Sequence, residues 1–391
     1  MAPKVVAVTG ASGFIGAHVV LALLRRGYIV HACVRNKDDA KNKFLLELGG
    51  PVRLFSALLL DEGAYDAAFA GAVGVIHVAA VLAIAGSADP IADMVEPSTR
   101  GTRNVLGSVA RCGVAHYVHT SSSAAMYDAR KGAALDEADW NPDKFVPGGG
   151  TDAYPFAKTE GERAVWELVA GQPFTCSCIN PTMVFGPCLA KQHAKASPFV
   201  FRQALCACSA RACARTRSPP PPPSPSPSPP LLVGASHSRP PPPRPPLFCR
   251  AARCSLSLSL SAADGNPYPN TPLAVVDVRD VADAHVEALE RHADADGLRF
   301  VLDGGDDTVP ANEHVRVAAR LFPQYAFALS EMKDPPTRAQ HPRGYVRRQW
   351  DNGLSKRVLG LRYTSRVQCI RDTVASMVET GWVPTKAKAK L

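Results

Sequence analysis

Four side chains near the middle of the sequence could together carry out acid–base chemistry on a carbonyl group. Tyr154 and Lys158 lie four residues apart at the predicted start of a helix, so both project from one helix face. A tyrosine with a pKa of about 10 is a weak acid at neutral pH, but an adjacent ammonium stabilises the phenolate and lowers that pKa. Ser122 and Ser123 follow a predicted strand, where a hydroxyl can hold a substrate carbonyl. Which of the two serines does so stays open.

A glycine-rich run directly after the first predicted strand indicates a dinucleotide site. Gly10 permits a tight turn, Gly13 lets the backbone approach a pyrophosphate, and Gly16 lets the first helix pack on the strand. The amino end of that helix favours an anion. The alternative is a tight turn with a purely structural role. The cofactor contacts predicted here are Thr9, Gly10, Gly13, Phe14, Ile15 and Gly16.

The end of the second predicted strand indicates which dinucleotide is bound. An acidic residue at this point would accept hydrogen bonds from the 2′-hydroxyl of NAD, whereas this chain has Arg35 and, a little further on, Lys41. A cation suits the 2′-phosphate of NADP, so the predicted cofactor is NADP(H). A solvated basic turn is the alternative.

Strand-like and helix-like segments alternate along the chain, which predicts an α/β Rossmann fold with a doubly wound parallel sheet. A smaller C-terminal α/β substrate lobe would follow. The predicted strands are 5–9, 28–34, 52–57, 74–78, 115–120, 174–179 and 273–278, and the predicted helices are 13–26, 91–112, 157–170 and 281–291.

One segment, residues 206–262, differs from the rest in composition. It holds 15 of the 35 prolines, seven arginines and no acidic residue, which predicts a disordered insertion. It supplies +7 of the formal net charge of +9, so the remaining +2 gives no reason to expect nucleic acid as a partner. The predicted map is a Rossmann domain at 1–182, the start of the substrate lobe at 183–205, the insertion, a return to sheet and lobe at 263–383, and a basic tail at 384–391.

Several further classes of protein are disfavoured. The six cysteines outside the insertion lack metal-type spacing, so no metal site is expected. The uncharged run 67–88 is long enough to cross a membrane, but its glycines and its Val-Ile-His-Val centre favour a buried strand. The first apolar run has no signal-peptide pattern before it, which predicts a cytoplasmic protein. The C-terminal Ala389-Lys390-Leu391 leaves a peroxisomal address as the alternative.

Several motifs together resemble the dihydroflavonol reductase/cinnamoyl-CoA reductase group of extended short-chain dehydrogenase/reductases. They are the run 8–16, His77-Val78-Ala79, Thr120-Ser121-Ser122, Tyr154 to Lys158, the run 180–187 and the run 276–282. The resemblance covers nearly all the chain outside the insertion. It implies Tyr154 as proton donor, Lys158 as electrostatic partner and ribose ligand, and Ser122 as carbonyl anchor. It also implies cofactor contacts from Val78, Ala79, Pro181 and Val184. The charged residues Asp277, Arg279 and Asp280 are interpreted as structural support.

The expected activity is NADPH-dependent reduction of a ketone or aldehyde on a small organic substrate. Cinnamoyl-CoA reductases show Asn-Trp-Tyr-Cys-Tyr-Gly-Lys where this chain has Asp-Ala-Tyr-Pro-Phe-Ala-Lys at 152–158, which disfavours that substrate. Leu58 and Asn36 stand where relatives usually carry aspartates near the adenine. The alternatives are a nucleotide-sugar epimerase, a hydroxysteroid dehydrogenase, or a non-catalytic protein that senses NADP. The oligomeric state stays open.

Overall fold

The fold was analysed in a computed structural model of the chain. It describes residues 4–80, 89, 91–128, 130–131, 134–144, 153–198, 201, 272–305, 309–325 and 350–382. The insertion 206–262 and the basic tail 384–391 lie outside the described residues, so the predictions made for them stay predictions.

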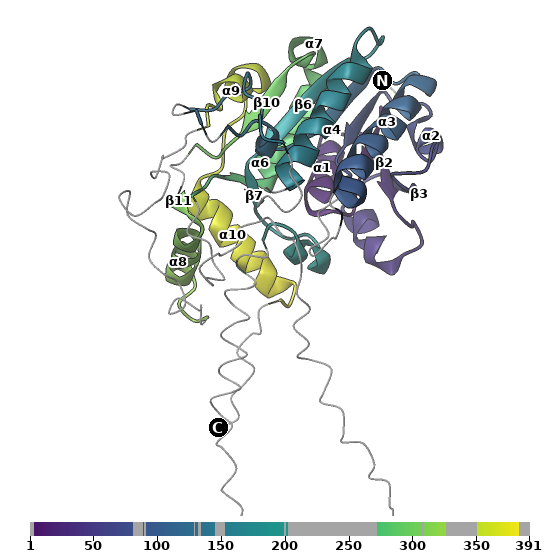
Figure 1. Cartoon of the computed structure of the whole chain (residues 1–391). Helices are drawn as coiled ribbons and strands as arrows, with labels where there is room; N and C mark the ends of the chain where they lie inside the picture. The colour runs from purple at the N-terminus through teal and green to yellow at the C-terminus, as the bar shows by residue number, and fades with distance from the viewer. Residues whose placement is uncertain are drawn as a thin grey trace, which may run out of the picture.

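A seven-stranded parallel sheet forms the centre of the molecule (Figure 1). Its order is β10-β6-β5-β4-β1-β2-β3. The chain adds β2 and β3 on one side of β1 and then adds β4, β5, β6 and β10 on the other side, so the switch point lies between β1 and β4. Open sheets of this kind bind ligands at such a switch point, beyond the carboxyl ends of the strands. The predicted doubly wound parallel sheet is therefore confirmed. Its strands are β1 (Val5–Thr9), β2 (Ile29–Val34), β3 (Val52–Ser56), β4 (Gly74–His77), β5 (His116–Thr120), β6 (Thr175–Pro181) and β10 (Arg299–Leu302).

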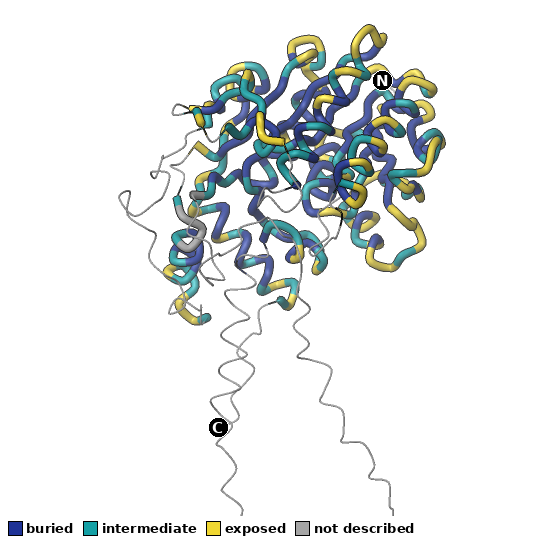
Figure 2. Tube along the Cα trace, viewed as in Figure 1, coloured by how far each residue is buried: buried dark blue, intermediate teal, exposed yellow. Residues whose placement is uncertain are grey.

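Helices cover both faces of the sheet. The central strands carry apolar side chains on both sides, so each face must be shielded from water. In β1, Val6 and Val8 contribute to one core while Ala7 contributes to the other. The first core is closed by α1 (Phe14–Arg25) and α6 (Val278–Glu290), and the second by α2 (Asp66–Phe69), α3 (Glu96–Arg111) and α4 (Ala153–Val169). Figure 2 shows the strands as a buried layer with exposed residues on the outer turns.

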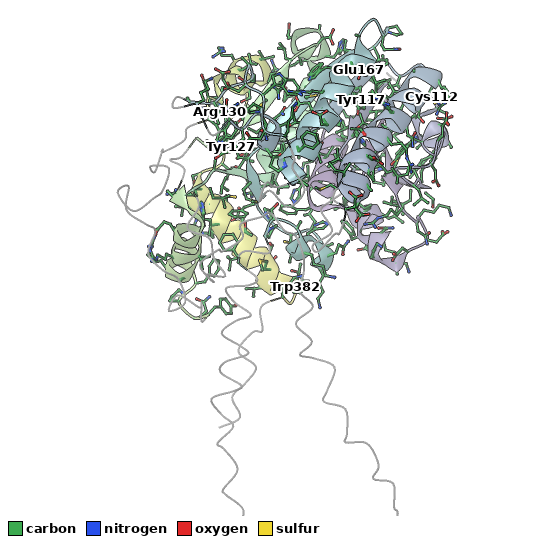
Figure 3. All side chains as sticks on the ribbon, viewed as in Figure 1. Cys112, Tyr117, Tyr127, Arg130, Glu167 and Trp382 are labelled. Carbon is green, nitrogen blue, oxygen red and sulfur yellow. The ribbon has the colours of Figure 1, made fainter. Side chains whose placement is uncertain are left out.

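A smaller set of elements lies beyond the sheet and forms the second lobe (Figure 1). β7 (Met183–Phe185) runs parallel to β9 (Val275–Asp277), and β8 (Pro272–Leu273) runs antiparallel to β11 (Val309–Pro310). The lobe also holds α8 (Ala311–Leu321) and α10 (Arg366–Glu379), whereas α9 (Gly353–Leu359) packs against β10 and α6 at the edge of the main sheet. Figure 3 places Trp382 at the far end of α10, where its indole N–H donates to the Lys191 carbonyl at 2.5 Å.

The prediction of one strand over 273–278 was wrong. The structure divides this stretch into β8 and β9, and α6 begins at Val278 rather than at residue 281. The helix starts early because Asp277 caps it, its carboxylate accepting from the Arg279 backbone N–H at 2.8 Å. The Arg279 guanidinium also bridges Asp277 and Asp372 at 2.7 Å each, which agrees with a structural role for these charges.

The uncharged run 67–88 contains the last residues of α2 and the whole of β4. Among the described residues, no helix is both long and apolar enough to cross a membrane.

Candidate active site

The glycine-rich run forms a turn that only glycines can make. Gly10 has a φ of +65°, and a Cβ there would lie 2.8 Å from the Ala79 backbone nitrogen. A Cβ on Gly16 would lie 2.3 Å from the Gly10 carbonyl oxygen. Gly13 is exposed in extended backbone at the amino end of α1 and has no capping side chain. The first N–H groups of this helix are therefore open to an anion.

Thr9 holds the glycine turn against the end of β4. Its hydroxyl oxygen accepts hydrogen bonds from the Val78 and Ala79 backbone N–H groups, both at 3.1 Å. With both accepting positions used, its proton goes to the His77 Nδ1 at 2.7 Å. Burial lowers the pKa of His77 to about 3, so the ring is neutral. Because the Thr9 side chain is fully buried and committed to these contacts, it positions Val78 and Ala79.

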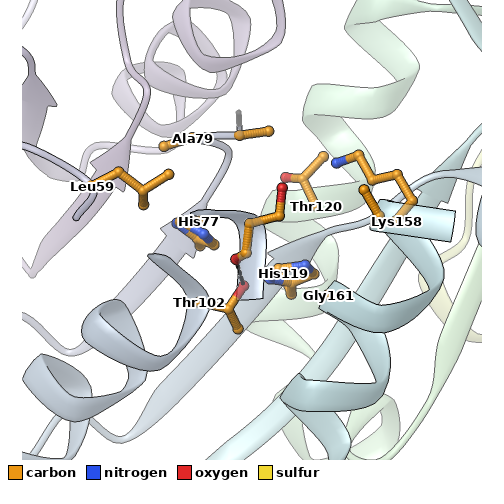
Figure 4. A pocket seen from close by; sticks show the side chains of 11 residues that line it. Leu59, His77, Ala79, Thr102, His119, Thr120, Lys158 and Gly161 are labelled. Carbon is orange, nitrogen blue, oxygen red and sulfur yellow. Dashed lines mark hydrogen bonds between the residues drawn. The ribbon is translucent and has the colours of Figure 1, made fainter. Parts of the chain in front are cut away.

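A pocket opens at the carboxyl ends of β4 and β5, next to the switch point between β1 and β4 (Figure 4). Figure 4 shows the Lys158 side chain reaching from α4 toward Thr120, with His77 and His119 below. The lining residues are Leu59, His77, Ala79, Ala80, Ser98, Thr102, His119, Thr120, Ala157, Lys158 and Gly161. Of the predicted site residues, the structure brings Lys158 and Ala79 together here.

Lys158 is the one charged side chain among the described residues that line this pocket. Burial also lowers the pKa of His119 well below its usual value, and its proximity to His77 and to the charged Lys158 lowers that pKa further. Both histidines are therefore neutral at pH 7. Among the described residues that line the pocket, no carboxylate lies beside the Lys158 ammonium, so its charge can act on a phenolate or on the hydroxyls of a ribose.

Thr120 is fixed by a histidine beneath the sheet. The His285 Nδ1 lies 2.7 Å from the Val281 carbonyl, which can only accept, so the ring proton sits on Nδ1. The His285 Nε2 then accepts from the Thr120 hydroxyl at 2.7 Å. Burial lowers the pKa of His285 to about 4, which keeps this tautomer neutral.

Ser122 and Ser123 lie just beyond the end of β5, and Tyr154 lies in the first turn of α4, which packs against the short helix that follows these serines. Ser122 has extended backbone and caps the short helix η3 (Ser123–Ala125), its Oγ accepting from the Ala124 N–H at 3.2 Å. That contact leaves the hydroxyl proton of Ser122 available for a second partner. Tyr154 is half-buried and packs in a small apolar cluster with Ala157, which itself lines the pocket.

The basic residues near the end of β2 differ in their surroundings. Arg35 is exposed and makes no ion pair with a described residue. Lys41 lies in the short helix η1 (Ala40–Glu47), where its Nζ pairs with Asp39 at 2.6 Å. Asn36 orders the turn between them, its carbonyl accepting from the Asn42 amide at 2.7 Å. Leu58, at the position where relatives carry an aspartate, is 47% exposed.

Pro181 and Val184 lie near the carboxyl end of β6, in the half of the sheet away from β2. Pro181 ends β6 and Val184 is in β7, and both are buried. Sequence reasoning did not single out His119, Thr102 or Leu59 as pocket residues. His119 precedes the Thr120-Ser121-Ser122 motif, so the alternation of side chains along β5 was the signal that could have found it. Thr102 and Leu59 offered no comparable signal.

Three comparisons place the chain among known reductases. The model of the NAD dependent epimerase/dehydratase family matches residues 6–213. Cinnamoyl-CoA reductase 1 of Arabidopsis thaliana is 30% identical over 386 residues, which covers 97% of this chain and 91% of that protein. Dihydroflavonol 4-reductase of Gerbera hybrida is 36% identical over 193 residues, 47% of this chain and 52% of that protein.

Among solved structures, the chain is similar to Gre2 of Candida albicans, crystallised in complex with NADPH. The TM-score is 0.70 at 25% identity, and the match covers 97% of this chain and all of that one. The sequence motifs, the sheet order and these matches agree with one another. The chain therefore belongs to the NAD dependent epimerase/dehydratase family, in the group that includes the cinnamoyl-CoA and dihydroflavonol reductases.

Proposed function

We propose that this chain is an NADPH-dependent oxidoreductase that reduces an aldehyde or ketone on a small organic substrate. The observation that carries the proposal is the shared pocket of Lys158 and Ala79. It joins the helix of the Tyr-x-x-x-Lys motif to the turn braced by the glycine-rich run. The reductases named in the comparisons support the same class of reaction.

The residues present fit a bound dinucleotide. The close approach of Gly10 to Ala79 and the open amino end of α1 make a cradle for the pyrophosphate. Exposed Arg35, followed along the chain by exposed Lys41, suits the 2′-phosphate of NADPH. Lys158 would hold the ribose, and Pro181 and Val184 would border the nicotinamide. When bound, the cofactor supplies the hydride that reduces the carbonyl carbon.

The protein side chains would manage the proton and the developing charge. Tyr154 donates its phenolic proton to the carbonyl oxygen, and the Lys158 ammonium stabilises the phenolate that remains. Ser122 donates a hydrogen bond to the same oxygen and polarises the carbonyl. The proton of the Ser122 hydroxyl is available for this contact because its cap to Ala124 uses only a lone pair.

The substrate is expected to lie between the sheet edge and the second lobe. In our map, residues 1–182 bind the cofactor, residues 183–205 begin the substrate lobe, and residues 263–383 return to the Rossmann sheet and complete that lobe. The segment 152–158 departs from the pattern of cinnamoyl-CoA reductases, so we propose a flavonoid-type ketone or another small carbonyl rather than a cinnamoyl thioester.

A panel assay tests this function. The purified full chain is mixed with NADPH and with aromatic aldehydes, flavonoid ketones or short α-dicarbonyls, and NADPH consumption is followed by absorbance. We expect at least one class to be reduced, and Tyr154→Phe to lower turnover by roughly two to four orders of magnitude while NADPH still binds. NADPH binding without oxidation by any carbonyl would favour a non-catalytic NADP sensor instead.

A further inference from the structure

A buried carboxylate on α4 lies outside the chemistry described above. Glu162 follows Lys158 by four residues and Tyr154 by eight, so the three lie along one stripe of the helix. Its side chain is fully buried. A buried carboxylate is strongly disfavoured unless its oxygens are paired and hydrogen-bonded. Its partners therefore indicate what it does.

The two oxygens of Glu162 have separate sets of partners. Oε1 pairs with the Nε of Arg299, the first residue of β10, at 2.6 Å. Oε2 accepts from the Ser121 hydroxyl at 2.5 Å and from the Asn180 amide nitrogen at 2.7 Å. The Asn180 amide nitrogen also donates to the Ser122 carbonyl at 3.3 Å. The Glu162 carboxylate thus links α4 to Ser121 directly and to the Ser122 carbonyl through Asn180.

The Asn180 amide is oriented to satisfy the hydrogen bonds of its nitrogen rather than those of its oxygen. Its Oδ1 is buried and has no hydrogen-bond partner among the described residues. Turning the amide over would place that oxygen against two acceptors, the Glu162 carboxylate and the Ser122 carbonyl. The side chain therefore keeps an unpaired oxygen so that its nitrogen can hold Ser122. Unsatisfied buried groups of this kind are rare in folded proteins.

Arg299 braces the serine loop from its other side. Its guanidinium donates to the carbonyls of Glu137 and Asp139 at 3.0 and 2.7 Å and lies 3.8 Å from the centre of the Trp140 ring. The same segment continues to Asn141, whose side-chain amide and backbone N–H donate to the carbonyls of Ala124 and Ala125, both in η3. Ser122 and Ser123 are therefore held between two segments that meet at the Glu162–Arg299 pair.

We propose that Glu162 is a positioning residue for carbonyl reduction, which fixes the Ser122 hydroxyl against the Tyr154–Lys158 face of α4. The Arg299 guanidinium neutralises the negative charge of Glu162. The inference rests on the proposed function. Because an error of about 1 Å in the placement of a catalytic group can lower turnover by about a hundredfold, such a brace affects kcat rather than NADPH binding.

Two double variants separate positioning from simple stability. Glu162→Met/Arg299→Met and Glu162→Gln/Arg299→Met both remove the buried charge pair, a change that is often tolerated when volume is kept. Only the Gln variant retains a side-chain oxygen for Ser121 and Asn180. Glu167→Gln is the control, because Glu167 lies on the outer side of the same helix and is exposed (Figure 3).

For each variant we would measure Tm, the Kd of NADPH, and kcat and KM for the carbonyl that the unaltered chain reduces fastest. We expect kcat of the Met/Met variant to fall at least about tenfold, and the Gln/Met variant to recover most of that loss at similar Tm and Kd. Equal kcat in the two variants would overturn the proposal, as would a kcat that only follows Tm, or failure of both to fold. An unaltered chain that reduces no carbonyl would instead refute the proposed function.

Discussion

At the scale of single residues, the surroundings of each hydroxyl distinguish Ser122 from its neighbours. Ser121 is buried and committed to Glu162, whereas Ser122 uses only a lone pair in its cap. We therefore expect Ser122→Ala to lower kcat by roughly a hundredfold, the usual effect of removing one donor to a developing oxyanion. The matched variant Ser123→Ala should lose less than about threefold. If Ser123 held the substrate carbonyl instead, steady-state kinetics would show the larger loss of kcat in Ser123→Ala.

We expect the cofactor preference to depend on single side chains as well. Exposed Arg35 has no ion pair with a described residue, while Lys41 shares its charge with Asp39. A hydrogen bond to a charged phosphate contributes about 1.5–3 kcal/mol, so NADPH should bind at least about tenfold more tightly than NADH.

In titrations that follow the fluorescence of the bound cofactor, Arg35→Asp should reverse that order. Lys41→Ala, its control, should produce a smaller change. Equal affinity of the unaltered chain for the two cofactors would show that Arg35 is only a solvated surface residue.

At the scale of elements, the glycine turn allows a graded test. Overpacking by one methyl group costs roughly 1–3 kcal/mol where backbone blocks it. A Cβ on Gly16 would lie 2.3 Å from the Gly10 oxygen, whereas a Cβ on Gly13 would lie 3.2 Å from the same atom. Gly16→Ala should therefore weaken NADPH binding at least about tenfold, and Gly13→Ala by less. Calorimetric titration that found Gly13→Ala to be the more damaging change would contradict this geometry of the turn.

The elements of the main sheet could be predicted from sequence because their signals are local. The run from Val5 to Thr9 and the glycines after it specify a strand, a turn and a helix without help from distant residues. The small lobe could not be predicted in this way. β7 and β9 have three residues each and pair across about 90 positions of the chain. The strand predicted over 273–278 is divided between β8 and β9, which pair with different strands, and it ends at the Asp277 cap of α6.

In the candidate site, too, residues in local motifs could be predicted from sequence, whereas residues that depend on distant contacts could not. Lys158 and Ala79 belong to motifs of fixed spacing, and the structure brings them into one pocket. Glu162 was missed because a lone glutamate on a helix is most often solvated, and its burial depends on Arg299, 137 residues further along.

At the scale of the whole molecule, buried neutral histidines predict sensitivity to acid. Burial lowers the pKa to about 3 for His77 and to about 4 for His18, His193, His285 and His314. A histidine with a lowered folded-state pKa gives stability that is present above its unfolded pKa of about 6.5 and is lost as the pH falls toward 4. Asp280, whose pKa burial raises to about 6, acts in the opposite direction, as do Asp283 and Glu137, whose pKa values burial also raises.

Each such histidine should lower the free energy of unfolding as the pH falls from 7 to 5, because the unfolded chain then binds a proton that the buried ring does not. Urea denaturation at the two pH values measures this change. His285→Gln should make the difference between the two pH values smaller by about the contribution of one histidine, whatever its effect at pH 7. A protein that is equally stable at both pH values would contradict the neutral state of these rings.

The most direct test of carbonyl reduction follows an isotope. The full chain is incubated with NADPH deuterated at the transferable C4 position and with a carbonyl that it reduces, and the alcohol is analysed by mass spectrometry. The account predicts one deuterium on the former carbonyl carbon for each NADPH oxidised, and a rate lowered by roughly two to four orders of magnitude in Tyr154→Phe. An alcohol without deuterium, or full activity in Tyr154→Phe, would contradict the proposed mechanism.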